Sequence, residues 1–376
     1  MVTASYVVPW HLDNTLRRIT SDFDVTVVGQ GVSSNEAAYP GIEWVDIDLN
    51  RKISVFADLR ALWQLCRLFR ARKPDIVHSI MPKAGLISAL AGFICRVPIR
   101  VHTFTGQIWT NRRPVARLVL YLLDRTINAL NTVCLTDSPS QSQLLYRHGF
   151  SSHGLPLPVL GQGSLSGVDF SRFDQSGQDA RRKQLRTDLG IGEQDFVFAF
   201  VARKSREKGA IDMIRAFSQV TAAHEVARLL FVGPDESSGE LAAMRKDTPA
   251  LFKNVDDIGQ VPDHERYLAI SQVLCLPSYR EGFGSIVIDA AATGVPVIGS
   301  DIAGLVDSIE NGKTGLLIPP GNIGKLVQAM LSMLENPQDC RQMGFAARHR
   351  AEDLFAADKM YALLRDFYFV KLSEKP

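Results

Sequence analysis

The sequence lacks the features that usually mark secreted, zinc-stabilised and membrane-spanning proteins. Its five cysteines are scattered, with no C-x-x-C pair and no histidine cluster beside them. This spacing argues against a disulfide framework or a zinc site and favours a reducing compartment. No uninterrupted apolar run reaches the roughly 18 residues that a membrane-spanning helix needs. The N-terminus has neither the basic flank nor the apolar core of a signal peptide, so we expect a cytoplasmic protein.

The chain has 376 residues, which is long for one hydrophobic core and favours two domains. Hydrophobic residues make up 46% and charged residues 22%, a balance typical of globular proteins with material for two cores. The opening stretch VTASYVVPW is typical of the end of a strand that runs into a loop. We therefore expect the true start to lie several residues upstream of Met1.

The net charge of +2 conceals an uneven distribution. Residues 1–160 hold 17 Lys+Arg against 11 Asp+Glu, which leaves 25 against 29 in the remainder. Within 51–73, seven basic residues accompany one acid, and the spacing is that of an amphipathic helix. Its expected apolar side consists of Leu59, Leu62, Leu65, Cys66 and Phe69. Such a helix either covers a sheet or also meets an anionic membrane surface, and both interpretations stay open.

Short apolar runs alternate with helical patterns along most of the chain. Strands are predicted at 24–29, 42–47, 75–80, 99–104 and 131–136, with helices at 54–72, 83–94 and 113–129. A Gly-, Pro- and Ser-rich linker is predicted at 151–177, after which strands resume at 195–203, 227–233, 272–278, 294–301 and 315–320. The alternation predicts an α/β protein with two doubly wound Rossmann-like domains that face a cleft.

The expected domains are 1–165 and 166–355, and a last helix within 356–376 is expected to pack back on the first domain. Several short motifs in these domains match a known signature only in part. GQGVSS (29–34) lacks the third glycine of a dinucleotide fingerprint, and the Gly-Lys-Thr at 312–314 lacks the first glycine of a phosphate loop. The D-x-D pattern occurs twice, at 22–24 and 46–48, which makes it a weak sign of a metal–nucleotide site. No G-x-S-x-G sequence stands at a strand–helix elbow, so an esterase has no support.

A basic turn follows the strand at 195–203. In FAFVARKSREKGAIDMIRAF the strand leads into Arg203 and Lys208, and a helix then begins beside a glycine. Strand ends are where open parallel sheets bind ligands. The planar fork of an arginine and the point charge of a lysine together suit a diphosphate. An ordinary exposed basic turn is the alternative.

The stretch REGFGSIVID (280–289) follows the strand at 272–278. Glycines at Gly282 and Gly284 admit close approach of a ligand, and a helix expected from about Ser285 offers its first N–H groups to an anion. Carboxylates accept hydrogen bonds from vicinal hydroxyls, so Glu281 and Asp289 suit a sugar or a ribose. The alternatives are a capping acid for Glu281 and an isolated exposed acid for Asp289.

Together these stretches resemble glycosyltransferase family 4, the retaining nucleotide-sugar transferases of the GT-B fold. The resemblance covers nearly the whole chain and includes ARKSREKG, EGFGSIVIDAAATGVPVIGSDIAG and NGKTGLLIPPGN. HTFTGQIWTN (102–111) and SIMPKAGLISAL (79–90) look like bacterial members that build surface or lipid-linked polysaccharides.

The resemblance implies roles for individual residues of this sequence. Arg203 and Lys208 would contact the donor diphosphate, and His102 would approach the donor sugar near the reacting carbon. Glu281 would lie near the sugar hydroxyls. The backbone of the following turn would meet phosphate and sugar, and it comprises Gly282, Phe283, Gly284 and Ser285.

Two positions depart from the family pattern. The second acid is usually glutamate, and here it is Asp289, one methylene shorter. The linker usually carries Asn-Gly-Val-Asp, whereas this chain has Ser166-Gly167-Val168-Asp169, so Ser166 receives no role. If Asp289 holds the ribose hydroxyls, either its helix lies closer to the ligand or a water bridges the gap.

The resemblance implies a hexosyl- or N-acetylhexosaminyltransferase that uses a nucleoside diphosphate sugar, most commonly UDP-linked, without cofactor or metal. The expected acceptor is lipid-linked or a saccharide, contact with an anionic membrane at its inner face is expected from the basic first half, and no nucleic acid is expected. A nucleotide-sugar epimerase or phosphorylase of the same fold, or a binding protein without catalysis, remains open.

Overall fold

The computed structural model describes residues 1–5, 7–49, 54–173 and 179–374. Residues 51–53 of the basic run and 174–177 of the predicted linker lie outside the described residues. The chain forms two compact units, Met1–Gly167 with Ala357–Pro376, and Val168–Ala356.

The first unit is built on a six-stranded sheet in the order β3-β2-β1-β4-β5-β6, with every described pairing parallel. Its strands are β1 (Val2–Ala4), β2 (Val25–Gln30), β3 (Ile42–Asp46), β4 (Ile76–Ile80), β5 (Ile99–Phe104) and β6 (Val133–Thr136). The order reverses between β1 and β4, as in doubly wound α/β folds, where Val2 is paired with both Val28 and Ser79.

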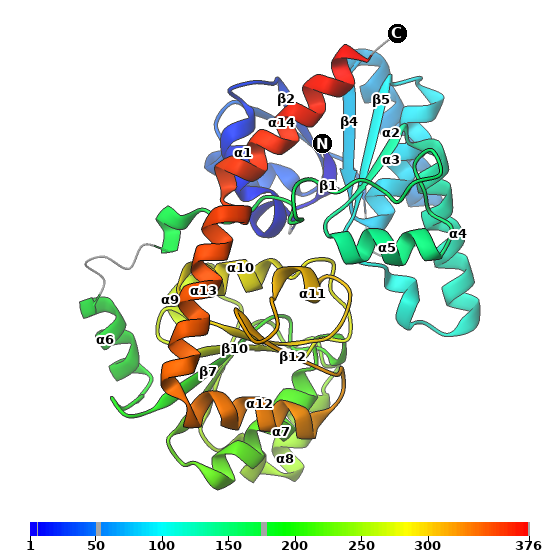
Figure 1. The fold of residues 1–376 in the computed structure, drawn as a ribbon. Helices are drawn as coiled ribbons and strands as arrows, with labels where there is room; N and C mark the ends of the chain where they lie inside the picture. The colour runs from blue at the N-terminus through cyan, green and yellow to red at the C-terminus, as the bar shows by residue number, and fades with distance from the viewer. Residues whose placement is uncertain (6, 50–53, 174–178, 375–376) are drawn as a thin grey trace. The chain divides into compact units, whose positions relative to one another are not determined.

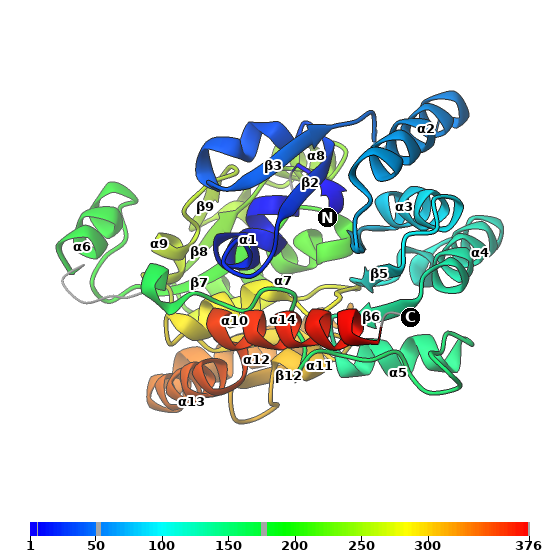
Figure 2. The same ribbon diagram turned by 90° about the horizontal axis from the view of Figure 1, so that it is seen from above.

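Helices flank this sheet (Figures 1 and 2). The longer ones are α1 (Asp13–Ile19), α2 (Val55–Arg72), α3 (Pro82–Ile94), α4 (Pro114–Leu130), α5 (Pro139–Arg147) and α14 (Ala357–Ser373), with short turns η1 (Val8–Leu12), η2 (Val32–Ala38) and η3 (Ile108–Asn111). Helices α2, α3 and α4 lie side by side in a row (Figure 2). The C-terminal helix α14 packs on this unit, where the Tyr368 hydroxyl is 2.6 Å from His78 Nδ1.

The second unit repeats the plan with the order β12-β11-β10-β7-β8-β9, again with parallel pairings. Its strands are β7 (Phe196–Val201), β8 (Ala227–Val232), β9 (Val255–Ile258), β10 (Val273–Leu276), β11 (Val297–Ser300) and β12 (Gly315–Ile318). Its helices are α6 (Asp179–Asp188), α7 (Ala210–Ala223), α8 (Glu240–Asp247), α9 (Glu265–Leu268), α10 (Ser285–Ala292), α11 (Leu305–Ser308), α12 (Ile323–Glu335) and α13 (Pro337–Phe355), with η4 (Phe170–Phe173), η5 (Arg206–Lys208) and η6 (Pro249–Phe252).

Burial on both faces explains why the strands of this unit read as continuous apolar runs. Along β7, Phe198 and Phe200 join the core beneath α7 and α12, while Val197, Ala199 and Val201 join the core on the opposite face. Side chains alternate between faces in a strand, so a parallel sheet covered by helices on both sides requires apolar residues at every position. The predicted α/β class and two-sheet architecture are therefore confirmed.

One prediction about α2 is wrong. Leu59 was expected on the packed side, but it is 58% exposed, whereas Leu65 and Phe69 are buried. Buried residues follow the stripe that begins at Ala61, two positions after Leu59 and therefore about 200° around the helix. Leu59 belongs to a second apolar stripe that faces outward with Phe56 and Trp63.

Candidate functional site

Two turns follow neighbouring strands of the second sheet: the basic turn, residues 203–209, and the glycine turn, residues 279–285. The basic turn leaves β7 and the glycine turn leaves β10, and these two strands are paired in parallel. The strand order reverses between them, since β8 lies beyond β7 and β11 lies beyond β10. Loops on either side of such a reversal turn to opposite faces of the sheet and leave a crevice in which open α/β sheets bind ligands. Two segments about 80 residues apart in the sequence are therefore assembled at one ligand-binding edge.

The basic turn is shaped by a glycine and anchored by a buried lysine. Gly209 has φ +72°, and a Cβ on it would lie 2.1 Å from the carbonyl oxygen of Pro277, so glycine is required at this close approach. Lys204 is buried, where its Nζ donates to Asp257 and to the carbonyl oxygen of Ile258 at 2.8 Å. Lys204 therefore anchors the turn and does not face the site.

Lys208 and Glu281 form the central ion pair of the site. Lys208 Nζ donates to Glu281 Oε1 at 2.6 Å, and the Ser278 hydroxyl donates to the same oxygen at 2.8 Å. The two charged side chains are 18% and 10% exposed, so the pair is largely screened from water. The structure therefore brings together one predicted residue from each motif.

Arg203 is held by acids that the sequence analysis did not single out. Its Nη1 donates to Glu236 at 2.5 Å, and its Nη2 lies 3.8 Å from Glu207. Glu207 also accepts from Arg280 Nε at 2.5 Å, and its backbone carbonyl accepts from the Tyr279 N–H at 2.9 Å. Glu207 therefore ties the basic turn to the glycine turn.

The charge state of Glu207 follows from these neighbours. Burial alone raises the pKa of this carboxyl, but the hydrogen bond and charge of Arg280, with further contributions from Lys208 and Arg203, bring the pKa below its usual value. Glu207 is thus an anion under ordinary conditions. Its position inside the motif ARKSREKG could have suggested a role, but its partner Arg280 is 73 residues away.

The glycine turn presents the start of α10. Gly284 precedes the helix with φ +82°, and α10 begins at Ser285, as predicted. A Cβ on Gly304 would lie 2.4 Å from the carbonyl oxygen of Gly282, so the loop before α11 packs closely behind the turn. Phe283 is buried and its ring centroid lies 5.1 Å from that of Phe355. The backbone of 282–285 is thereby fixed while the first N–H groups of α10 lack helical partners.

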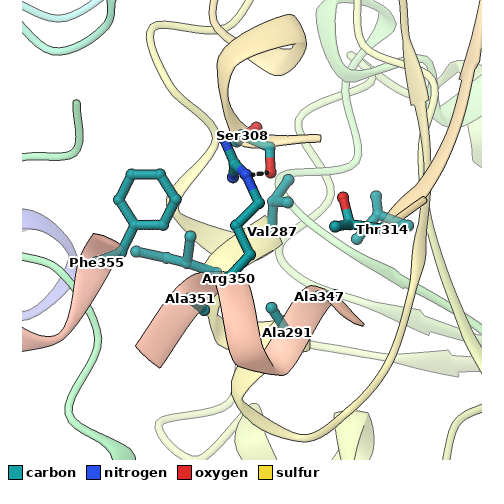
Figure 3. A pocket seen from close by; sticks show the side chains of 10 residues that line it. Val287, Ala291, Ser308, Thr314, Ala347, Arg350, Ala351 and Phe355 are labelled. Carbon is teal, nitrogen blue, oxygen red and sulfur yellow. Dashed lines mark hydrogen bonds between the residues drawn. The ribbon is translucent and has the colours of Figure 1, made fainter. Parts of the chain in front are cut away.

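Arg350 supports this arrangement from α13 (Figure 3). Its guanidinium donates to the carbonyl oxygens of Asp307 at 2.7 Å and Ser308 at 3.1 Å, the last residues of α11. Burial lowers the pKa of Arg350, and its guanidinium lies 5.1 Å from the ring centroid of Phe355. A cavity of about 10 Å³ beside it has room for about one water. This cavity is too small for a sugar, so Arg350 has a structural role.

Asp289 lies on α10 and is paired with a histidine. His264 Nε2 is 3.0 Å from Asp289 Oδ2, and His264 stands directly before α9. The carboxyl is 21% exposed, so the alternative of an isolated acid on an exposed face does not hold. Sequence reasoning missed His264, because nothing in VPDHERYL marks it and its partner is 25 residues away.

His102 belongs to the first unit, on β5. Its Nδ1 lies 2.9 Å from the Ser79 hydroxyl of β4, and the residue is buried. Burial lowers the pKa of His102 to about 3, so the imidazole is neutral. A Cβ on Gly85 would lie 2.4 Å from His102 Cε1, so this glycine makes room for the ring. In the described part of the chain, His102 Nε2 has no hydrogen-bond partner.

The described residues hold no cluster of metal ligands and no disulfide. Within residues 1–5, 7–49, 54–173 and 179–374, no group of three or more His, Cys, Asp or Glu is placed to hold a metal ion. The five cysteines are free thiols.

Comparison with known proteins identifies the family. The model described as glycosyl transferases group 1 matches residues 181–350, and the glycosyl transferase 4-like domain matches residues 12–156. The chain is 31% identical over 339 residues to the capsular polysaccharide biosynthesis glycosyltransferase CapM of Staphylococcus aureus, covering 87% of this chain and 86% of that protein. The chain therefore belongs to the family 4 glycosyltransferases and is an enzyme of that class.

Further relatives agree with this assignment. The chain is 26% identical over 295 residues to a UDP-Gal:α-D-GlcNAc-diphosphoundecaprenol α-1,3-galactosyltransferase of Escherichia coli, covering 77% of this chain and 73% of that protein. Among solved structures, Anabaena HepE in complex with UDP-glucose matches with a TM-score of 0.79 at 19% identity, with 96% of each chain covered. The lipopolysaccharide glycosyltransferase WaaG matches with a TM-score of 0.72 at 15% identity, covering 93% of this chain and 94% of that one. The fold is thus GT-B.

Proposed function

We propose that this enzyme transfers a sugar from a nucleoside diphosphate sugar, UDP-linked, to a hydroxyl of a lipid-linked or saccharide acceptor in cell-surface polysaccharide synthesis. The transfer retains the anomeric configuration and requires no metal ion. The second unit, 168–356, binds the donor, and the first unit binds the acceptor.

The observation that carries the proposal is the joining of two motifs at β7 and β10. Lys208 pairs with Glu281 of the glycine turn, and Arg203 lies near Glu207, which Arg280 of that turn also contacts. The N–H groups at the start of α10 also attract anions. A nucleoside diphosphate needs such groups around its phosphates, and a carboxylate such as Glu281 suits sugar hydroxyls. Lys208 is paired with Glu281 in the structure, so a donor diphosphate would compete with this carboxylate for Lys208.

The chemistry follows from this charge arrangement. When the bond between the anomeric carbon and the diphosphate breaks, negative charge grows on the leaving phosphate oxygen while the sugar becomes oxocarbenium-like. Lys208, Arg203 and the amides of 282–285 stabilise the leaving group. The acceptor hydroxyl bonds to the anomeric carbon on the same face, and its proton passes to an oxygen of the departing diphosphate. His102 is neutral, so it can donate or accept a hydrogen bond to the sugar but adds no positive charge.

The choice of donor and pathway is supported by the relatives. The Escherichia coli relative is named for a UDP-Gal donor and a diphosphoundecaprenol acceptor, and the Staphylococcus aureus relative for capsular polysaccharide biosynthesis. The HepE structure contains UDP-glucose. Extending these properties to this chain gives a UDP-sugar donor and a surface-glycan acceptor.

A donor panel tests this function. Purified enzyme is incubated with UDP-, GDP- and ADP-linked sugars, and nucleotide release is measured with and without undecaprenyl diphosphate-linked sugars and in excess chelator. We expect chelator-resistant release from a UDP-sugar that an acceptor accelerates, with an α-linked product from an α-linked donor. A converted nucleotide sugar formed without acceptor would instead indicate an epimerase, and binding without turnover would indicate a non-catalytic protein.

The first unit offers a surface that suits an anionic membrane. Apolar side chains of α4 point outward, with Leu118 58% and Leu122 52% exposed. Arg117 lies on the same helix and Arg113 directly precedes it. The outer stripe of α2 adds further exposed apolar residues, and this helix lies in the same row of helices (Figure 2). No helix among the described residues is long and apolar enough to cross a bilayer. Exposed apolar groups flanked by arginines favour attachment to a membrane surface.

Liposome flotation tests this attachment. The wild-type protein should float with vesicles containing anionic lipid, and the double variant Leu118→Ser with Leu122→Ser should float at least several-fold less, because it loses apolar area that enters the headgroup region. The matched control is Phe345→Ser, which removes an exposed apolar residue from the second unit. Equal flotation with neutral and anionic vesicles would contradict the proposal.

A further inference from the structure

The shortened acid of the donor motif has an unusual partner. Position 289 carries an aspartate, whose carboxylate lies one methylene closer to the α10 backbone than that of a glutamate would. Its Oδ2 is engaged by His264 Nε2 at 3.0 Å. In the part of the chain that the structure describes, Oδ1 of the same carboxyl has no hydrogen-bond partner. One oxygen is thus fixed and the other is available to accept.

His264 is well placed to fix this carboxyl. Its side chain is 10% exposed, and its ring centroid lies 6.4 Å from that of Phe173 in η4. The residue stands immediately before α9, and α9 packs on α10. Packing therefore holds the imidazole ring of His264 in one orientation, with its Nε2 directed at Asp289 Oδ2.

The charged groups around His264 support a protonated imidazole. Burial lowers the pKa of His264, but the hydrogen bond and charge of Asp289 and the nearby Glu265 outweigh burial, even against Arg172, and raise the pKa above its usual value. Glu265 Oε2 lies 3.8 Å from Nδ1.

We propose that His264 positions Asp289 so that its free Oδ1 accepts a hydrogen bond from the ribose of the donor nucleotide. This proposal rests on the proposed function, since it requires the donor to be a nucleotide sugar with its ribose at Asp289. An aspartate reaches less far than a glutamate. The hydrogen bond from His264 to Oδ2 holds the Asp289 carboxylate in one rotamer, so Oδ1 stays in one position. His264 is a positioning residue, because it acts on the ribose through Asp289.

A purely structural bridge between α9 and α10 is the competing interpretation. Such a bridge would affect unfolding but would not distinguish a ribose from a deoxyribose. The decisive readout is therefore the ratio of the dissociation constants for UDP and for its 2′-deoxy and 3′-deoxy analogues.

Titration calorimetry with UDP measures this ratio in the wild type and in two variants. His264→Phe keeps a ring beside Phe173 but removes the N–H donor, and His264→Gln retains a donor. We expect the wild type to prefer UDP over at least one deoxy analogue by about tenfold or more. His264→Phe should bind UDP roughly tenfold more weakly and bind that analogue as the wild type does, whereas His264→Gln should keep most of the preference.

The control is His224→Gln, which removes the imidazole that lies 3.3 Å from Glu335 in the same unit. It should leave both dissociation constants unchanged. Melting temperatures of each variant show whether the fold is retained, and His264→Leu, which also removes the N–H donor, takes the place of His264→Phe if that variant does not fold.

Two outcomes would overturn the inference in different ways. UDP binding with an unchanged UDP-to-deoxy ratio in His264→Phe would make His264 a structural bridge while leaving the proposed function intact. If no nucleoside diphosphate binds the wild type, the proposed function is wrong, and the inference that depends on it is wrong too.

Discussion

At the scale of single residues, His102 shows how packing can fix both the charge and the position of a polar group. Its ring is buried between strands, bonded to Ser79 and bounded by Gly85 on α3. Burial lowers its pKa to about 3, so the ring offers a neutral Nε2. The position of His102 Nε2 therefore depends on Gly85, because any side chain at residue 85 would displace the ring.

Gly85→Ala should therefore impair transfer without unfolding the protein. The new Cβ would lie 2.4 Å from His102 Cε1, so the ring must move away from its place. We expect kcat to fall by roughly tenfold or more if His102 contacts the reacting sugar. The control is Gly324→Ala, which is also helical, has its nearest neighbour at 3.6 Å and should leave kcat unchanged. A Gly85→Ala enzyme with normal kcat would remove the proposed role of His102.

The pair of His264 and Asp289 predicts a pH-dependent stability. The pKa of His264 is raised in the folded protein, so its contribution is fully present below the unfolded pKa of about 6.5. It is lost as pH rises through the higher folded value. The difference in free energy of unfolding between wild type and His264→Gln should thus shrink as the pH rises above about 6.5. Urea denaturation across that range measures it, and a difference independent of pH would refute the charged pair.

Residue types in the site were largely predictable, but their partners were not. Lys208, Arg203, Glu281 and Asp289 lie within motifs whose chemistry can be read locally. Glu207 and His264 acquire meaning only through contacts to residues 73 and 25 positions away, which depend on the β7–β10 pairing and on α9 packing against α10. No local pattern encodes such contacts.

At the scale of elements, the return of α14 to the first unit is fastened by buried polar groups. The Tyr368 hydroxyl lies 2.6 Å from His78 Nδ1, and His78 Nε2 lies 2.7 Å from the Thr103 hydroxyl. Burial lowers the pKa of His78 to about 3 and raises that of Tyr368, so the chain of hydrogen bonds joins neutral groups.

Tyr368→Phe should destabilise the first unit by about 1–3 kcal/mol, because a ring nitrogen of His78 would be buried without its partner. Chemical denaturation measures the loss. Tyr146→Phe is the matched control, since the Tyr146 hydroxyl bonds to Gly154 at the surface at 3.2 Å and its removal should cost less than about 0.5 kcal/mol. An equal decrease in the free energy of unfolding in the two variants would show that the buried Tyr368–His78 hydrogen bond stabilises the protein no more than the exposed Tyr146 bond does.

Helix α2 shows the limit of periodicity at this scale. The spacing correctly predicts a helix, but two apolar stripes lie on it, and one of them contains the exposed Leu59. Periodicity gives the angle between residues, whereas the side that faces the sheet is set by tertiary packing. The assignment of Leu59 to the core was wrong for this reason.

At the scale of the whole molecule, alternation of strands and helices suffices to predict two doubly wound sheets. Each sheet reverses its order at the pair of strands that begins its two halves, β1 with β4 and β7 with β10. The second reversal places the basic turn next to the glycine turn. Fold and candidate donor site are thus linked, because the strand order decides which loops become neighbours.

The central claim is that Lys208 and Arg203 stabilise charge on a departing diphosphate. The most direct measurement is kcat for sugar transfer by Lys208→Ala and Arg203→Ala, with Lys313→Ala as control because Lys313 is an exposed partner of Glu310 in the same unit. Each of the first two variants should lose on the order of 10²-fold or more in kcat, while the control stays near wild type. Near-normal turnover in both site variants would contradict the account.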